Sequence, residues 1–279
     1  MTAGRGKEAV TGVSIGDRET ALENEILRVE VGSTAHGMGT GADDLDLMGV
    51  YIETPEQLLG IAPSKGHYVS RTQPEGVRSG PGDVDLTMYS LRKYLRLACA
   101  GNPTLLVLLY SSTVHATTPL GDELRALAPA IVSRQAGNRF LGYLDGQLQR
   151  MRGGGRQSRV PSRPELVERY GFDTKYAAHA LRLGLQGREL LRTGQLTLPM
   201  PVDDCAVVLA MRRGEYTRDE ADDIVDGTRA LLAADVSDRD LGPLRDRPDL
   251  DAVNAFAVRA HQHRWLRHYR QRYMEGMPS

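Results

Sequence analysis

The sequence predicts an α+β protein, in which an N-terminal mixed sheet with flanking helices is followed by a helical C-terminal domain. Two observations predict this class. Segments that alternate apolar and polar residues, as half-buried strands do, occur before about Pro119. Helical periodicity dominates after that point. We therefore expect a sheet-bearing domain over residues 1–118 and a helical domain over residues 119–279.

The elements of the first domain are expected in a definite order. A short helix is expected at 18–26, strands at 27–31, 45–52, 67–72 and 84–89, and helices at 91–100 and 103–110. Ser90 can cap the helix at 91–100, and Gly101-Asn102-Pro103 ends it. The last two strands are expected to pair antiparallel through a turn rich in glycine and proline.

The second domain is expected to be helical throughout. Helical patterns cover 120–150, 173–193, 217–235 and 249–273. The first two are separated by an arginine- and glycine-rich loop at 151–164, which is expected to be flexible. In the last helix, Trp265, Leu266 and Tyr269 are expected to pack against the rest of the protein.

Composition limits the class of protein but does not reveal its function. The chain has 279 residues, with 41% hydrophobic and 25% charged residues, as in soluble globular proteins. Because the net charge is −1, any site for a polyanion must come from local clustering. The N-terminus lacks the apolar core of a signal peptide, and no apolar run could span a bilayer. Cys99 and Cys205 lie in apolar contexts and are expected to be buried thiols in a cytoplasmic protein.

One segment carries a pattern with chemical meaning. Gly32 and Ser33 end a strand, where backbone amides and a hydroxyl can bind phosphate oxygens. Asp44 and Asp46 open the next strand two residues apart, so their carboxylates share a face. A third acid, Asp85, joins them if its strand is a neighbour. Such a cluster is unfavourable unless a divalent cation such as Mg²⁺ compensates it. The alternative is a glycine-rich loop with solvated acids.

The same segments carry a resemblance to a known family. It lies in GSTAHG and DDLDLMGVYI (32–37 and 43–52), DLTMYSLRKYLRLACAGNP (85–103) and KYAAHALRLGLQGRELLRTGQL (175–196). Through them the chain resembles the nucleotidyltransferases of the DNA polymerase β superfamily, and within it the RNA-ligase-associated, RlaP-like group. The resemblance runs over most of the chain. It implies a polymerase β-like fold for the first domain.

The resemblance also implies a reaction and its residues. A nucleoside monophosphate would pass from an NTP to an acceptor hydroxyl, phosphate or similar group, with Mg²⁺ or Mn²⁺ as cofactor. Asp85, rather than Asp83, would complete the catalytic and metal-binding set with Asp44 and Asp46. The chain departs from the family pattern at Asp43, Met48 and Val107, where Ser, Arg and Glu are common; these changes leave the three acids intact but put the choice of substrate in question.

A helix in the second domain carries a further candidate site. Lys175, His179 and Arg182 are spaced four and three residues apart, so they share one face. Facing a cleft, this stripe would suit a triphosphate or an RNA backbone. The other interpretation is an interdomain histidine with solvated charges. Because the resemblance includes this helix, we expect the three residues to bind nucleotide together with Gly32 and Ser33.

Other basic residues support two interpretations each. Arg92 and Lys93 could meet phosphates near the metal or form a solvated helix face. The loop arginines could capture a polynucleotide or belong to a plain linker; they are Arg150, Arg152, Arg156, Arg159 and Arg163. The spacing of His261, His263 and His268 does not make a good metal site on a helix.

Two functions of different classes follow. The first is an active nucleotidyltransferase whose acceptor is an RNA end, a protein hydroxyl or a small molecule. An RNA end is preferred, because arginine is concentrated in the loop at 150–163 and in the C-terminal helix. The second is a non-catalytic or regulatory module that keeps the fold, such as the partner of a toxin. Three intact acids favour the enzyme, and a protein partner stays open in either case.

Overall fold

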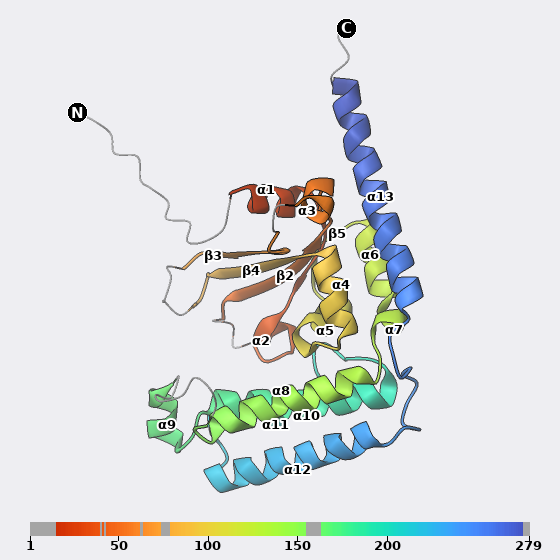
Figure 1. Cartoon of the computed structure of the whole chain (residues 1–279). Helices are drawn as coiled ribbons and strands as arrows, with labels where there is room; N and C mark the ends of the chain where they lie inside the picture. The colour runs from red at the N-terminus through yellow and green to blue at the C-terminus, as the bar shows by residue number, and fades with distance from the viewer. Residues whose placement is uncertain are drawn as a thin grey trace, which may run out of the picture.

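The computed structural model describes residues 15–39, 41, 43–61, 64–73, 79–154 and 163–275. The predicted fold class is confirmed: a five-stranded mixed sheet with helices is followed by a group of helices (Figure 1). The strands are β1 (Glu25–Glu30), β2 (Leu45–Tyr51), β3 (His67–Arg71), β4 (Val84–Ser90) and β5 (Val114–Thr117). The helices up to Ile131 are α1 (Ile15–Glu23), α2 (Gly32–Ala35), α3 (Pro55–Leu59), α4 (Leu91–Cys99), α5 (Pro103–Tyr110), α6 (Pro119–Ala126) and α7 (Ala128–Ile131). The later helices are α8 (Gln135–Met151), α9 (Pro164–Tyr170), α10 (Thr174–Thr193), α11 (Val202–Arg213), α12 (Arg218–Ser237) and α13 (Leu250–Glu275).

The sheet is mixed because one of its pairs is parallel. Its strand order is β3-β4-β2-β1-β5. β2 and β4 run parallel, whereas the other neighbouring strands run antiparallel. The antiparallel pairing predicted for the strands at 67–72 and 84–89 is confirmed as β3 with β4. The parallel pair places the start of β2 beside the start of β4, although the two are far apart in sequence.

The two faces of the sheet are covered differently. On one face, Leu47, Leu86 and Met88 form a small cluster with Ala21 of α1. On the other face, Val29 and Val50 belong to a large core that takes in α4–α6 and continues into α8, α10 and α12. The sheet and the later helices therefore share one hydrophobic core, and the division into domains at 118/119 stays a prediction.

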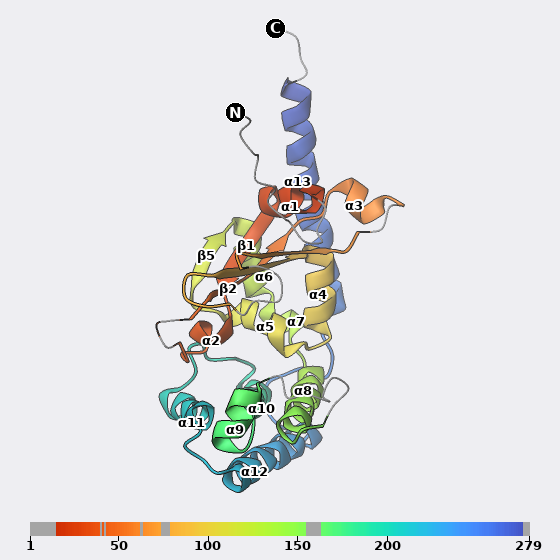
Figure 2. The same ribbon diagram turned by 90° about the vertical axis from the view of Figure 1, so that its left-hand side faces the viewer.

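Helices α8 to α12 form a second layer beneath the sheet. Figures 1 and 2 both show α8–α12 stacked at one end of the sheet, next to α2 and α5. α10 is the centre of this layer, because it contacts α8, α11 and α12. Asp173 caps its start by accepting from the amides of Lys175 and Tyr176, and Gly194 ends it with φ of +74°.

The structure corrects several expected elements. The first helix ends at Glu23, because Glu25 pairs with Tyr51 as part of β1. β5 was not expected: it is a four-residue edge strand that pairs only with β1 among the described strands, and so short a segment shows little alternation. α9 and α11 were also missed. α11 buries only Cys205, Val208 and Met211, so its apolar face is narrow.

The C-terminal helix returns to the sheet domain. α13 contacts α4 and α7 and runs on past the sheet (Figure 1). Trp265 packs as expected, donating from Nε1 to the carbonyl of Glu53 at 2.7 Å. The expectation was wrong for Leu266 and Tyr269, which are 59% and 52% exposed.

Two smaller observations concern the whole chain. Both cysteines are buried free thiols, as the sequence predicts. None of the described helices has both the length and the apolar character needed to cross a bilayer.

Candidate functional site

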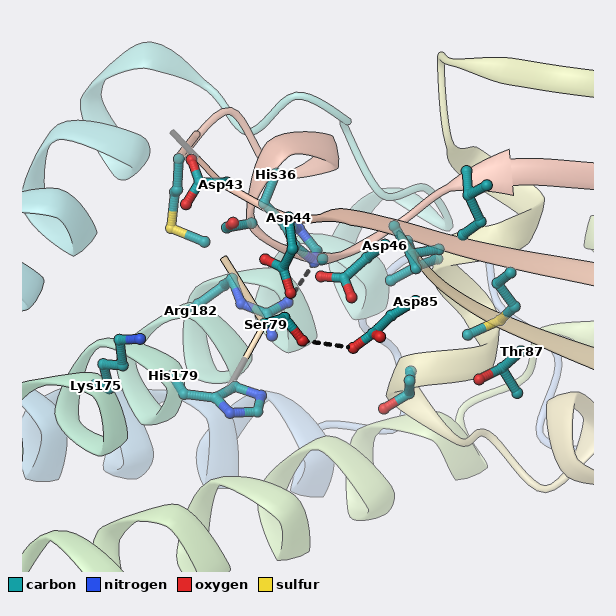
Figure 3. Close-up of a pocket in the computed structure, with 18 of the residues that line it drawn as sticks. His36, Asp43, Asp44, Asp46, Ser79, Asp85, Thr87, Lys175, His179 and Arg182 are labelled. Atoms are coloured by element: carbon teal, nitrogen blue, oxygen red, sulfur yellow. Dashed lines mark hydrogen bonds between the residues drawn. The ribbon is translucent and has the colours of Figure 1, made fainter. Parts of the chain in front are cut away.

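The three predicted acids meet at the start of the parallel strand pair. Asp46 of β2 and Asp85 of β4 are register partners, and Asp44 directly precedes β2. One carboxylate oxygen from each acid lies within 4.8 Å of the others. Figure 3 shows the three side chains pointing toward one another at the centre of a pocket. The sequence analysis required the strand of Asp85 to lie next to that of Asp46. The pairing of β2 with β4 meets this condition.

The electrostatics of this cluster fit a divalent cation. Burial, and then the carboxylates of Asp44 and Asp85, raise the pKa of Asp46 to about 6. A shift of this kind shows that the ionised form is unfavourable without a compensating charge. Carboxylate oxygens are the hard ligands that Mg²⁺ and Mn²⁺ accept. The donor set and its excess negative charge are thus suited to a divalent metal ion.

Side chains just after β3 and just before β4 hydrogen-bond to Asp85. Gln73 donates from Nε2 to Asp85 Oδ1 at 2.9 Å, and the Ser79 hydroxyl donates to Oδ2 at 3.0 Å. Arg71 lies 3.8 Å from the same carboxylate. Gln73 and Ser79 could not be found from the sequence, because a polar residue in a glycine-rich turn carries no pattern that marks its partner.

Position 32 requires glycine because of its backbone conformation and because Asp46 lies close to it. Its φ is +70°, a region that side chains disfavour. A Cβ at this position would lie 2.7 Å from Cγ of Asp46. Only glycine lets the backbone pass this close to the acid, and Ser33 follows it in α2, lining the pocket.

The α10 stripe lines the same pocket as the acids. Lys175, His179 and Arg182 all border this cavity of about 840 Å³. Burial lowers the pKa of His179 to about 3, with Arg182 adding to the shift, so the ring is neutral at pH 7. Burial also lowers the pKa of Arg182, to about 10, which leaves it a cation. The stripe therefore presents two positive charges and one neutral ring.

A buried histidine lies directly behind the stripe. Arg182 donates to Nε2 of His36 at 2.7 Å, and Gln186 contacts Nδ1 at 3.1 Å. His36 and Gln186 are each 3% exposed. The sequence analysis missed both residues. Gln186 continues the spacing of the stripe and could have been found from it, whereas His36 lies on another element.

The departures from the family pattern all lie in the pocket lining. Asp43 is 3.9 Å from the guanidinium of Arg212, so its added negative charge has a partner. Met48 and Val107 are 4% and 6% exposed apolar side chains. The loss of an arginine at one position and of a glutamate at the other leaves both sites uncharged.

Of the other basic candidates, Arg163 lines the pocket, whereas Arg92, Lys93 and Arg152 do not. Neither Arg92 nor Lys93 lines the pocket as far as the structure describes the chain, and Lys93 donates to the carbonyl of Lys65 instead. Arg152 pairs with Asp222 and Asp226 on α12. The centre of the arginine-rich loop, 155–162 with Arg156 and Arg159, is outside the described residues.

Comparison with known proteins gives a family match and likenesses to solved structures. The model of a family described as "RNA repair pathway DNA polymerase beta family", RlaP, matches residues 17–239. None of the curated proteins compared matches the chain. A nucleotidyltransferase-like protein from Exiguobacterium sibiricum 255-15 is similar in structure, with 12% identity and a TM-score of 0.30, over 80% of this chain and 72% of that one.

Proposed function

This chain belongs to the RNA repair pathway DNA polymerase beta family, and from that premise we propose that it is a metal-dependent nucleotidyltransferase. It would move a nucleoside monophosphate from an NTP to an acceptor, which we propose to be an RNA end. The observation that carries the proposal is the meeting of three carboxylates and a cationic helix face in one pocket.

Each side of the pocket has a role in this proposal. Asp44, Asp46 and Asp85 would hold Mg²⁺ or Mn²⁺. A bound divalent ion would lower the charge repulsion between an NTP and these acids and would favour attack by an acceptor oxygen. Because the pairing of β2 with β4 holds Asp46 next to Asp85, these acids would determine where the acceptor oxygen meets the phosphate.

The nucleotide would lie between the acids and α10. Lys175 and Arg182 supply positive charge for the triphosphate, and His179 supplies a neutral ring nitrogen for hydrogen bonding. Gly32 and Ser33 provide a close-lying backbone and a hydroxyl on the other side. A divalent ion held by the three acids would compensate the negative charge of both the acids and the phosphates.

An RNA acceptor is supported by the family description and by nearby arginines. Arg163 lines the pocket and lies over the ring of Tyr176 at 5.1 Å, and Arg150 lies over the same ring at 5.9 Å. In this proposal both arginines would contact the phosphate backbone of the RNA outside the acid cluster. RNA affinity should fall as salt rises, and the Arg150→Ala and Arg163→Ala variants should give a shallower slope.

The direct test is metal-dependent NTP binding followed by transfer. The full chain is titrated with each NTP with and without Mg²⁺ or Mn²⁺, then incubated with labelled NTP and a panel of RNAs. Asp44→Asn should abolish transfer while the thermal unfolding curve stays the same. Asp223→Asn, on the exposed side of α12, is the matched control and should stay active. Binding without transfer would indicate the regulatory alternative, and label on protein would indicate protein nucleotidylation.

A further inference from the structure

The last helix lies beyond the part of the chain that the family match covers. The match ends at residue 239, whereas α13 begins at Leu250. α13 has 26 residues, and none of its described residues lines the pocket that holds the three acids. At a rise of about 1.5 Å per residue, the helix is about 39 Å long. The proposed nucleotidyltransferase site therefore does not explain why the chain has so long a helix here.

One face of α13 packs against the rest of the protein. Val253, Phe256 and Ala260 are at most 4% exposed and belong to the large hydrophobic core. Further along the helix, Arg264 donates to the side chain of Asn24 at 2.8 Å. These contacts fix the rotation of the helix about its own axis, so the opposite face points away from the protein.

That opposite face carries exposed apolar side chains. In the described part of the chain, four of the eleven exposed large apolar side chains lie on α13, more than on any other helix or strand. Three of them, Val258, Leu266 and Tyr269, are 56%, 59% and 52% exposed. With three other exposed residues at intervals of three or four they share one helix face. We name this face the outer stripe and define it by six residues: Asp251, Ala255, Val258, Gln262, Leu266 and Tyr269.

Apolar side chains on two opposite faces of a helix indicate that both faces are covered in the working protein. Figure 1 shows α13 along the edge of the molecule, with the sheet, α4 and α6 on one side of it. The same view shows its C-terminal part running on past the sheet. The outer stripe therefore needs a partner from outside this chain.

The composition of the outer stripe selects the kind of partner. Its members include one acid and no lysine or arginine, so it does not suit the phosphate backbone of a polynucleotide. Gln262 lies four residues from Val258 and four from Leu266, between the two aliphatic side chains. A glutamine amide both donates and accepts, so it can bond to an identical glutamine across a two-fold axis. This symmetry of polar and apolar positions fits a second copy of the same helix.

The charges along α13 select the direction in which two copies pair. Asp251 lies in the first turn of the helix, whereas all the arginines of α13 come after Val258. In an antiparallel pair, the acidic start of each helix lies beside the arginine-containing part of the other. A parallel pair would instead bring like charges and like ends of the helix dipoles together.

We propose that the outer stripe binds the outer stripe of a second copy of this chain, as an antiparallel helix pair with its two-fold axis at Gln262. Val258 of one copy then faces Leu266 of the second copy, and Ala255 faces Tyr269. The symmetry repeats each contact on the other side of the axis, so the interface is closed and forms a dimer. This inference does not rest on the proposed function.

The first test is the mass of the full chain in solution, measured by light scattering at about 1 to 100 µM, where dimers of modest affinity dissociate. The mass should rise with concentration to about twice 30.6 kDa. Leu266→Asp puts two charges into the apolar interface and should raise the Kd of the dimer about 100-fold. Leu231→Asp, at a leucine of α12 that is 50% exposed, is the matched control and should leave the Kd unchanged. Far-UV circular dichroism checks that both variants are folded.

The second test locates the two-fold axis with disulfides. Cys99 and Cys205 are buried, so under mild oxidation an introduced exposed thiol reacts first. Gln262→Cys should form a covalent dimer with itself. Tyr269→Cys should not, because its two positions lie about 21 Å apart along the pair, and a disulfide needs Cα atoms within about 7 Å. A mixture of Val258→Cys and Leu266→Cys should give the mixed dimer.

Each outcome decides the proposal. A monomer at every concentration, or a dimer that Leu266→Asp leaves intact, would mean that the outer stripe does not bind a second copy. Tyr269→Cys dimers that form as fast as those of Gln262→Cys would overturn the antiparallel arrangement. None of these measurements involves NTP, so the dimer and the nucleotidyltransferase can fail separately.

Discussion

The guanidinium of Arg182 donates a hydrogen bond to Nε2 of His36 across 146 positions of the sequence. An arginine cannot accept, so this ring nitrogen carries no proton. Burial, and then the nearby charge of Arg182, hold the pKa of His36 well below its usual range. His36 therefore acts as a fixed neutral acceptor that aims the arginine into the pocket.

Replacing His36 should weaken nucleotide binding without removing a charge. In His36→Ala the guanidinium keeps Gln186 but loses its other acceptor. The Kd for NTP with Mn²⁺ should then rise about tenfold, as for loss of a hydrogen bond to a charged group worth about 1.5–3 kcal/mol. Isothermal titration measures this. His263→Ala, at an exposed histidine of α13, should leave the Kd unchanged. An unaltered Kd in His36→Ala would show that Arg182 needs no positioning.

Gly32→Ala should impair metal binding more than folding. The added Cβ lies 2.7 Å from Cγ of Asp46, so the carboxylate must leave its present position beside Asp44 and Asp85. Gly153→Ala is the matched control: its φ is +82°, close to +70° at Gly32, but nothing lies within 4 Å of its Cβ. Both variants should lose about 1–2 kcal/mol of stability from the backbone alone. Only Gly32→Ala should lose Mn²⁺ affinity, and equal affinities in both would contradict the role given to Gly32.

Much of the fold and the acids could be predicted because their patterns are local. Two acids separated by one residue share a strand face whatever the topology, and cap residues such as Ser90 act on the next turn of the chain. The convergence of Asp46 with Asp85 could only be stated conditionally. It depends on β4 pairing with β2 as well as with β3. The alternation of apolar and polar residues does not reveal which strands are neighbours.

The positioning residues could not be predicted, because their partners are distant. His36 acquires its role only when α10 packs against α2, and Gln73 only when the pairing of β3 with β4 brings it to Asp85. The edge strand β5 was missed for a related reason. Its four residues gain their hydrogen bonds from β1, which lies far earlier in the chain.

The turn that holds Asp85 should affect turnover more than nucleotide affinity. Ser79→Ala and Gln73→Leu each remove one hydrogen bond from the carboxylate. Loss of such an outer partner lowers activity about 10- to 100-fold where the carboxylate binds a metal. We expect kcat to fall in that range, with the Kd for NTP within about threefold. Thr72→Val, which disturbs the same turn through Asp83 and Val84, is the control. A loss of kcat in Thr72→Val as large as in the two variants would assign the effect to the turn as a whole.

The docking of α13 should depend on pH through His261 and Glu53. His261 donates from Nδ1 to the carbonyl of Ala257 at 2.7 Å, and its Nε2 lies 3.1 Å from the Glu53 carboxylate. Both partners are acceptors, so the ring is a cation. Burial alone would lower the pKa of His261, but the bonds to Glu53 and Ala257 raise it above 6.5. Burial alone would raise the pKa of Glu53, but the bonds from His261 and Ser90 lower it below 4.5.

The sign of the effect follows from these two shifts. The contribution of His261 is fully present below pH 6.5 and is lost as the pH rises through its raised pKa. That of Glu53 is present above pH 4.5 and is lost as the pH falls through its lowered pKa. His261→Gln should therefore lower the free energy of unfolding most between about pH 4.5 and 6.5, by about 1–3 kcal/mol. The difference should shrink toward pH 9 in urea unfolding, whereas His263→Gln should show none. A difference that stays constant from pH 5.5 to 9 would mean that His261 is neutral in the folded protein.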